Sequence, residues 1–396
     1  MAAHIPFVNT QDDLRCLKQY YADSKMVRIP LAIMSAIRQN IPTHMGLWID
    51  AGIDGYDCRL TKRKTFDQWE DHISRFQEYD ILGDPEFVRK PDADRLKRFA
   101  RSALNECHAL QPLWITIPQL PVTTDGSRNR VNRELAGIVG EWKSVSGFKG
   151  DLILPLIFTH QGQLQGRTQW TKKLLSAKKC YQDSGASGIW AVDSDLAEQK
   201  CRERFPKRFQ SLIEFHEDLR NDFPKATIVA GPYWGMNIVL WVRQLCDRPA
   251  ISLGTGYQYF ISGRFRIRKK GPRKVHVSLP PLRRWAVASQ KLREWLGRVT
   301  AQLSSSDAAC GDLRTLYNDL GLLMGNEEAA KKQVAKTYKV WLDKIESVPP
   351  DGRSLVLYQD LSSAYVLGKQ LPKLPKAEAP GIEAGKVAEQ LMLQCL

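Results

Sequence analysis

Three titratable side chains, those of Asp50, His160 and Asp193, stand at or just after the ends of apolar segments. Asp50 ends the apolar segment 46–50 and precedes a turn, 51–56, that contains two glycines. A carboxylate or imidazole at the end of a buried segment can bind a substrate or act as a nucleophile or general acid–base. We therefore predict that these three residues are catalytic.

Each of the three residues also has a purely structural interpretation. Asp50 could bind the amides of the tight turn that follows it, which Asp often does. Asp193 could cap the next helix, because N-caps favour Asp and Ser. His160 could satisfy backbone groups near a strand end. The sequence leaves both interpretations open at each position.

A second set of residues near the same segment ends suits binding of a flat heterocycle. Amide side chains can read the polar edge of such a ring, while aromatic side chains stack on its face. The alternative for the aromatic residues is a place in the core. The predicted substrate-binding residues are Gln119, Gln161, Gly162, Tyr233, Trp234 and Tyr257.

A basic segment between residues 264 and 274 alternates cationic and apolar residues at its start. This period is typical of an exposed strand or hairpin that presents its cations on one face. An ordinary solvated surface is the alternative. The predicted nucleic-acid-binding residues are Arg264, Arg266, Arg268, Lys269, Lys270, Arg273 and Lys274.

The overall charge favours an anionic partner. The chain has 396 residues and a formal net charge of +15, from 58 Lys and Arg against 43 Asp and Glu. Such an excess favours polyanions through phosphate neutralisation and counterion release. We predict a nucleic acid, DNA or tRNA, as the partner, with other protein subunits as additional partners.

Several classes of protein are disfavoured by what the sequence lacks. The eight cysteines are scattered without a CxxC pair, so we predict no zinc or other metal site. Neither GxGxxG nor GxxxxGK[ST] occurs, and we predict no cofactor. No apolar run approaches the ~20 residues of a membrane span, and dispersed cysteines without a signal peptide predict a cytoplasmic protein.

Eight short apolar segments predict strands that alternate with helical patterns. Several are nearly continuous in Ile, Leu, Val and Trp, as in strands buried on both faces. This alternation predicts an α/β fold, a (β/α)8 TIM-like barrel, with a doubly wound open sheet as the alternative. The predicted strands are Ile5–Asn9, Arg28–Ser35, Gly46–Gly52, Leu113–Gln119, Leu152–Phe158, Gly188–Ser194, Thr227–Tyr233 and Ala250–Phe260.

The segments between and after the predicted strands have helical patterns. Apolar stripes beginning at Leu96, Val131 and Phe209 predict helices between the strands, and a capping box at residues 65–68 predicts the start of another. A stripe from Trp285 to Val299 and the segments 334–345 and 355–367 predict three more. We therefore predict a barrel domain, residues 1–280, and a helical C-terminal appendage, residues 281–396.

Two motifs give the chain a resemblance to a known family. The segment 50–56, Asp-Ala-Gly-Ile-Asp-Gly-Tyr, and the segment 156–162, Leu-Ile-Phe-Thr-His-Gln-Gly, resemble base-binding segments of the tRNA-guanine transglycosylase family, which includes relatives that insert 7-deazaguanines into DNA. The resemblance implies a barrel in which Asp50, Gln161 and Gly162 bind a base. The chain departs from the family where Ser252 replaces the nucleophilic Asp and where the zinc-binding cysteines are absent.

These observations lead to one main hypothesis and two alternatives. The main hypothesis is a nucleic-acid-acting barrel, transglycosylase-like, that exchanges or modifies bases. The first alternative is a non-catalytic nucleic-acid-binding subunit of a multi-protein system. The second is a small-molecule barrel hydrolase that uses Asp50 and Asp193 as a carboxylate pair.

Overall fold

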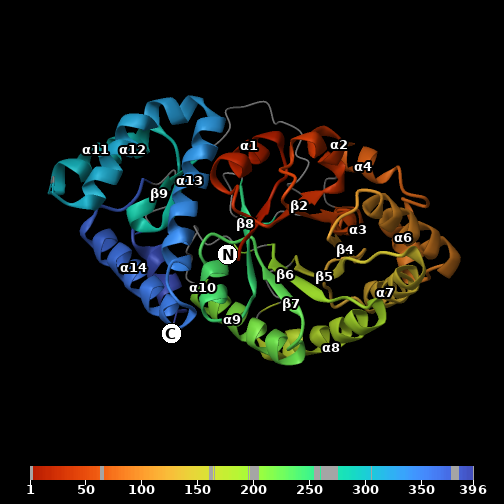
Figure 1. Cartoon of the computed structure of the whole chain (residues 1–396). Coiled ribbons are helices and arrows are strands. Elements are labelled where there is room, and N and C mark those ends of the chain that lie inside the picture. The colour runs from red at the N-terminus through yellow and green to blue at the C-terminus, as the bar shows by residue number, and fades with distance from the viewer. Residues whose placement is uncertain are drawn as a thin grey trace.

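A computed structural model shows that the predicted barrel is correct. It describes residues 3–62, 67–159, 164, 166–194, 196, 205–253, 259, 275–304, 306–375 and 383–395. Eight parallel strands close on themselves in chain order, which excludes an open sheet, and helices surround them (Figure 1). The strands are β1 (Ile5–Phe7), β2 (Met26–Pro30), β3 (Gly46–Asp50), β4 (Trp114–Thr116), β5 (Asp151–Phe158), β6 (Gly188–Asp193), β7 (Thr227–Ala230) and β8 (Arg248–Ser252).

Each predicted strand overlaps one observed strand, but β2 differs in extent. A strand was expected over 28–35, whereas β2 spans 26–30 and residues 31–37 form a short 3-10 and α-helical segment. Proline lacks the amide hydrogen that would continue a strand ladder, so Pro30 is a natural end for the strand. The barrel closes where β1 pairs with β8, with Phe7 in register with Ser252.

The helices predicted between the strands are present. The stripes that begin at Leu96, Val131 and Phe209 lie on α6, α7 and α9, and their apolar members are buried except Ile138, which is partly buried. The predicted capping residue Thr65 lies outside the described residues. The barrel helices are α1 (Gln11–Tyr20), α2 (Met34–Ile37), α3 (Tyr56–Leu60), α4 (Asp67–Ile73), α5 (Pro85–Arg89), α6 (Ala93–His108), α7 (Gly126–Ser146), α8 (Arg167–Ser184), α9 (Phe205–Asp222) and α10 (Met236–Val242).

The inside of the barrel is filled with large aromatic rings. Phe7, Trp48 and Trp190, from three different strands, meet edge to face with ring centroids 5.5–5.7 Å apart. All three side chains are buried. Barrels of this kind are more often filled by branched aliphatic residues, so these wide aromatic rings are an unusual interior.

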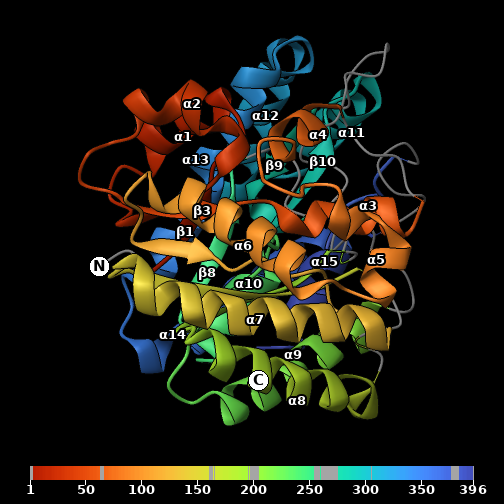
Figure 2. The same cartoon turned by 90° about the vertical axis from the view of Figure 1, so that its right-hand side faces the viewer.

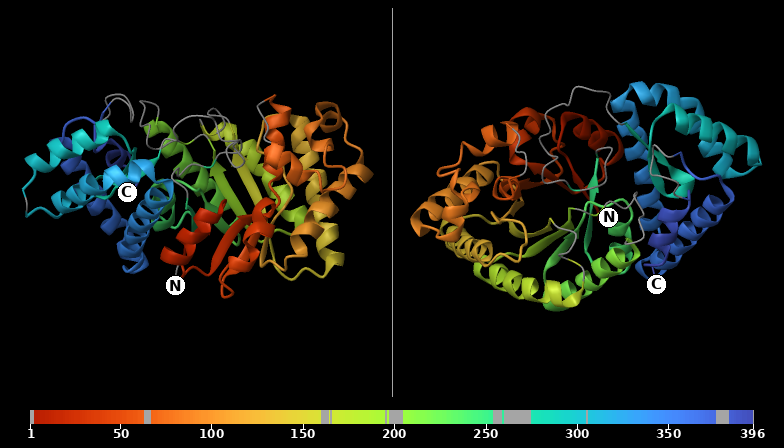
Figure 3. Two further views of the ribbon diagram at one scale, coloured as in Figure 1. Left: turned by 90° about the horizontal axis from the view of Figure 1, so that it is seen from above. Right: turned by 180° about the vertical axis from the view of Figure 1, so that it is seen from behind.

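The C-terminal part of the chain adds helices and a hairpin on one side of the barrel (Figure 1; Figure 3, left). Its elements are β9 (His276–Leu279), β10 (Arg284–Val287), α11 (Gln290–Gln302), α12 (Ala308–Gly325), α13 (Glu327–Glu346), α14 (Pro350–Gln370) and α15 (Lys386–Met392). Apolar residues of the hairpin, α11 and α12 form a second core. This second core includes β9, which precedes the predicted boundary at residue 281.

The helix predicted to contain Trp285 and Ala288 begins later than expected. Trp285 lies in β10, which pairs with β9, and α11 begins only at Gln290. Ser289 marks the start, because its hydroxyl accepts a hydrogen bond from the amide of Leu292 at 3.2 Å. The apolar residues before Ser289 therefore belong to strand β10 and its pairing with β9, and not to the predicted helix.

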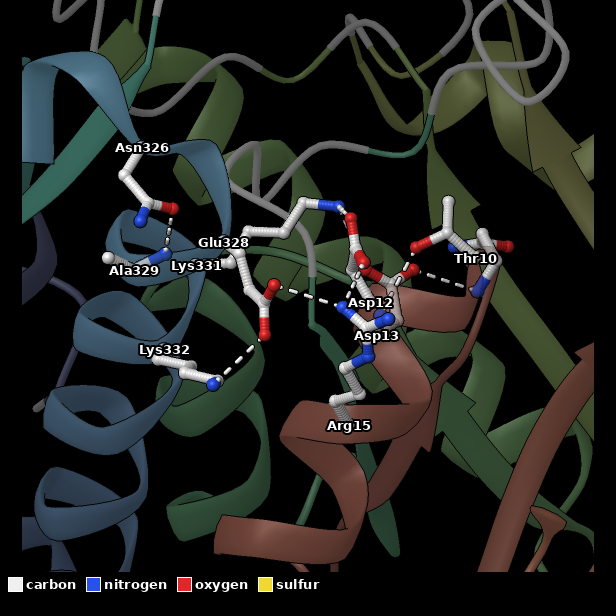
Figure 4. Close-up of polar contacts among 10 residues, drawn as sticks. Thr10, Asp12, Asp13, Arg15, Asn326, Glu328, Ala329, Lys331 and Lys332 are labelled. Carbon is white, nitrogen blue, oxygen red and sulfur yellow. Dashed lines mark hydrogen bonds and ion pairs between the residues drawn. The ribbon is translucent and has the colours of Figure 1, made fainter.

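Helix α13 takes the place of the eighth barrel helix. It packs on α1, and buried residues of α13, α14 and α15 belong to the same core as the strands. Polar contacts join the two helices: the buried Lys331 lies near Asp13, and the exposed Arg15 donates to Glu328 at 2.9 Å (Figure 4). The chain therefore inserts the hairpin, α11 and α12 between β8 and the helix that completes the ring.

Candidate functional site at the carboxyl end of the barrel

The side chain of Asp50 points into the barrel, at the carboxyl end of β3. Successive residues of a strand alternate between its two faces, and Trp48, two residues earlier, lies among the interior rings. Asp50 is in register with Pro30 and Thr116 on the neighbouring strands and is buried. The carboxyl ends of the strands are where barrels of this class place their active sites.

Asp50 forms a buried ion pair with Arg28 of β2. Nη2 of Arg28 donates to Oδ2 of Asp50, and Nη1 of Arg28 donates to Oδ1 of Asn9 at 3.2 Å. The Arg28 residue is 0% exposed and Asp50 is 3% exposed. Removing two charges from water costs several kcal/mol per ion, and pairing recovers that cost only with good geometry. An ion pair inside the barrel is thus a feature that stability alone does not favour.

Aromatic rings enclose the guanidinium of Arg28. Its Cζ lies 4.7 Å from the ring centre of Phe7, 5.1 Å from that of Trp190 and 6.0 Å from that of Tyr259. Such faces attract a cation, and the attraction is stronger where water is excluded. Within the described part of the chain, Nε of Arg28 has no hydrogen-bond partner. The site therefore combines an anion, a cation and aromatic faces in one small volume.

A second carboxylate, Asp54, is linked to this group through Tyr259. The hydroxyl of Tyr259 donates to Oδ2 of Asp54 at 2.8 Å, and its ring packs edge to face on Trp190 with centroids 4.9 Å apart. Both Asp54 and Tyr259 are buried. Tyr259 thus connects the turn after β3 to the interior rings of the barrel.

The turn after Asp50 is held rigidly by the barrel helix α4. Gly52 has a φ of +75°, which favours glycine, and its amide donates to Oδ1 of Asp50 at 3.0 Å. The carbonyl of Gly52 accepts from Trp69, and that of Ala51 lies 3.3 Å from Nε2 of His72. Asp50 therefore does bind the turn as the structural interpretation expected, and it also holds Arg28.

Asp193 lies on the other face of the barrel wall from Asp50. It follows the interior residue Trp190 by three positions, which reverses the face, and its carboxylate pairs with Arg208 of α9. Nε and Nη2 of Arg208 lie 2.7 and 2.5 Å from the two carboxylate oxygens. This placement gives no support to Asp50 and Asp193 as a carboxylate pair that flanks one bond.

Gln119 is directed toward a helix. Its Nε2 donates to the carbonyl of Asn132 on α7 at 2.8 Å, and the side chain of Asn132 in turn binds both backbone groups of Leu120. Gln119 is buried. The contacts that the structure records for this amide tie the loop after β4 to α7.

Tyr233 and Trp234, which follow β7, are buried. The hydroxyl of Tyr233 accepts from the amide of Asp193 at 2.6 Å. Nε1 of Trp234 donates to the carbonyl of Arg283 at 2.7 Å, and its ring packs on Tyr338 of α13. The structure therefore brings Tyr233 to the outer residue Asp193, and Trp234 to the boundary with the C-terminal helices.

The remaining predicted site residues lie outside the described residues. These are His160, Gln161, Gly162, Tyr257 and the whole basic segment, Arg264, Arg266, Arg268, Lys269, Lys270, Arg273 and Lys274. Their roles stay predictions from the sequence.

Sequence reasoning missed Arg28 as a member of the site. One signal for Arg28 was available: it is the single charged residue of β2, whose sequence is Met-Val-Arg-Ile-Pro. Charged residues are almost never fully buried unless they are paired. An arginine in an otherwise apolar strand therefore indicated a buried anionic partner. The sequence did not indicate which carboxylate that partner is.

Comparisons with other proteins assign no family to the chain, so its class is taken from the fold alone. Neither the protein-family models nor the curated proteins compared with the sequence match it. Over the ranges described above, no group of three or more His, Cys, Asp or Glu is placed to hold a metal ion. No helix in those ranges has the length and apolar character needed to cross a membrane. The class established by the structure is a (β/α)8 barrel with additional C-terminal helices.

Proposed function

We propose that this barrel acts on nucleic acid at its carboxyl end, as a transglycosylase-like enzyme that exchanges or modifies a base. The observation that supports this most is the Arg28–Asp50 pair, buried among aromatic rings at the end where barrel enzymes bind substrates. The net charge of +15 supports a polyanionic substrate.

In this proposal Asp50 accepts hydrogen bonds from the edge of an extruded base. A base must leave its stack to reach a carboxylate inside a barrel, and aromatic side chains then replace the lost stacking. Phosphates would be held by the basic segment 264–274, as the sequence predicts. Asp193 and His160 stay candidate catalytic residues, while Ser252 ends β8 in register with the interior residue Phe7.

The test separates nucleic-acid binding from chemistry. Binding of a single-stranded DNA oligonucleotide and of an unmodified tRNA would be measured by fluorescence anisotropy over a range of salt concentrations. We expect log K to fall linearly with log salt, with a slope set by the number of phosphates contacted. An affinity that does not depend on salt, or a lack of binding at low salt, would contradict the proposal.

Chemistry is tested by incorporation of isotope-labelled free bases into the nucleic acid. We expect Asp50→Asn to abolish incorporation and to keep the salt-dependent part of binding. Asp151→Asn is the matched control, because Asp151 begins β5 at the opposite end of the barrel, where it binds Trp114 and Ser187. The control should keep full incorporation.

A non-catalytic nucleic-acid-binding subunit is the second candidate function. It is favoured by the engagement of both candidate carboxylates, Asp50 by Arg28 and Asp193 by Arg208. If the chain serves only for binding, Asp50→Asn and Asp193→Asn will leave the activity of the complete system unchanged. The salt-dependent affinity for nucleic acid would then be the whole contribution of this chain.

A further inference from the structure

We infer that Arg28 is a positioning residue, which keeps the Asp50 carboxylate ionised and oriented at the carboxyl end of the barrel. The part played by the oriented carboxylate rests on the proposed function; the electrostatic coupling between the two residues does not. Arg28 reaches Asp50 from the neighbouring strand, and its guanidinium is directed by Asn9 and by the rings of Phe7 and Trp190.

In the described part of the chain, Arg28 supplies a counter-charge to Asp50. Among the described residues of other elements, His72 of α4 and Cys107 of α6 are titratable groups that act on Asp50. Burial lowers the pKa of His72 to about 4, and burial raises the pKa of the Cys107 thiol, so both groups are neutral near pH 7. The nearby carboxylate Asp54 is occupied by Tyr259. Among these described neighbours, Arg28 is the one that supplies positive charge.

The geometry also fixes the direction of the carboxylate. Arg28 binds Oδ2 and the amide of Gly52 binds Oδ1, so the two oxygens are held by groups on two separate segments. Neither partner can move easily, because Arg28 is enclosed by rings and Gly52 is held by Trp69. A carboxylate restrained at both oxygens is pre-organised for one ligand geometry, which reduces the entropy lost on binding.

The first arm of the test measures unfolding and does not depend on any activity. Arg28→Met leaves Asp50 buried without its guanidinium, and protonation of the carboxyl group relieves that cost. The destabilisation of Arg28→Met relative to wild type should therefore grow as the pH rises from 5 to 8, measured by urea unfolding. In Arg28→Met/Asp50→Asn this growth should disappear. A penalty of equal size at every pH, unaffected by Asp50→Asn, would overturn the inference.

The second arm asks whether the positioning matters for a ligand. Affinity for the single-stranded DNA oligonucleotide would be compared among Arg28→Met, Asp50→Asn and the double variant. We expect each single variant to lose about tenfold to a hundredfold, and the double variant to lose no more than either, because the two residues act as a unit. Arg28→Lys should recover part of the loss. Additive losses would show that Arg28 acts apart from Asp50.

Arg128→Met is the control for a purely structural loss. Arg128 of α7 pairs with the fully buried Asp57 at 2.9 Å. This variant should lose stability and keep wild-type affinity per folded molecule. If it lowers affinity as much as Arg28→Met, the role of Arg28 is structural only. If the wild-type protein binds no oligonucleotide, the proposed function fails, and the unfolding arm still decides whether Arg28 holds the charge of Asp50.

Discussion

Lys331 and Asp13 are 318 residues apart in the chain, yet Nζ of Lys331 lies 3.5 Å from Oδ1 of Asp13. Both residues are buried, the first on α13 and the second on α1. The contact joins the first barrel helix to the helix that completes the ring, and Figure 4 shows it within a group of ion pairs. Closure of the helical ring therefore depends on a part of the chain that follows the inserted hairpin, α11 and α12.

Lys331→Met should destabilise the fold. The change leaves the carboxylate of Asp13 buried without its cation, and breaking a buried pair in this way costs about 3 kcal/mol. The free energy of unfolding, measured in urea, should fall by about that amount. Lys332→Met is the matched control, since Lys332 pairs with Glu328 at the exposed surface of the same helix. If the two variants are equally stable, the contact does not hold α13 to the barrel.

Acid should destabilise the protein through His216 and His72. Burial lowers the pKa of each to about 4, from an ordinary value of 6.5. Between pH 6.5 and 4 the unfolded chain takes up a proton that the folded chain does not, so stability falls as the pH falls. Each histidine contributes about 1.4 kcal/mol per pH unit in this window, and nothing above it.

His216→Gln tests this, because His216 is fully buried on α9 and lies apart from the candidate site. The free energy of unfolding of the variant should fall less steeply between pH 6.5 and 4 than that of wild type. His44→Gln, at an exposed position, should keep the wild-type slope. A wild-type slope in His216→Gln would show that its imidazole is protonated in the folded protein.

Gly140→Ala should destabilise the packing of α7 on α8, which lie side by side in Figure 2. A Cβ at this position would lie 2.2 Å from the carbonyl oxygen of Asp183, a backbone atom of α8. Overpacking of this kind costs about 1–3 kcal/mol. Gly137→Ala, one turn earlier, meets nothing within 4 Å and should raise stability by about 0.5–1 kcal/mol. Opposite shifts in thermal midpoint are expected, and shifts of equal sign would contradict the close approach.

Asp193→Asn and Arg208→Met should lower stability by similar amounts, about 3 kcal/mol, because each breaks the same largely buried two-point ion pair. Glu86→Gln, in an exposed pair with Arg89, should change little. The base-incorporation activity distinguishes a catalytic role of Asp193 from a structural one. If its carboxylate is catalytic, Asp193→Asn abolishes base incorporation per folded molecule, whereas Arg208→Met, which keeps the carboxylate, does not.

The positions of the barrel strands could be predicted from the chain because each strand is a short run of apolar residues between helical stripes. Trp48 and Trp190, for example, stand in the middle of such runs. The boundaries were less secure where a local signal competes, as at Pro30 and at Ser289. The direction of the Asp50 and Asp193 side chains shows a further limit of prediction from the sequence. A strand buried on both faces has no alternation of polar and apolar residues that would tell its inner face from its outer face.

Local sequence therefore determined the barrel class, the order of its elements and the place of Asp50 at the end of β3. Only the tertiary structure decided that Arg28 meets Asp50, that Asp193 faces α9 and that α13 completes the helical ring. The physical reason is the range of the interactions. Strand and helix formation follow from neighbouring residues, whereas the pairing of buried charges depends on which strand faces are brought together when the barrel closes.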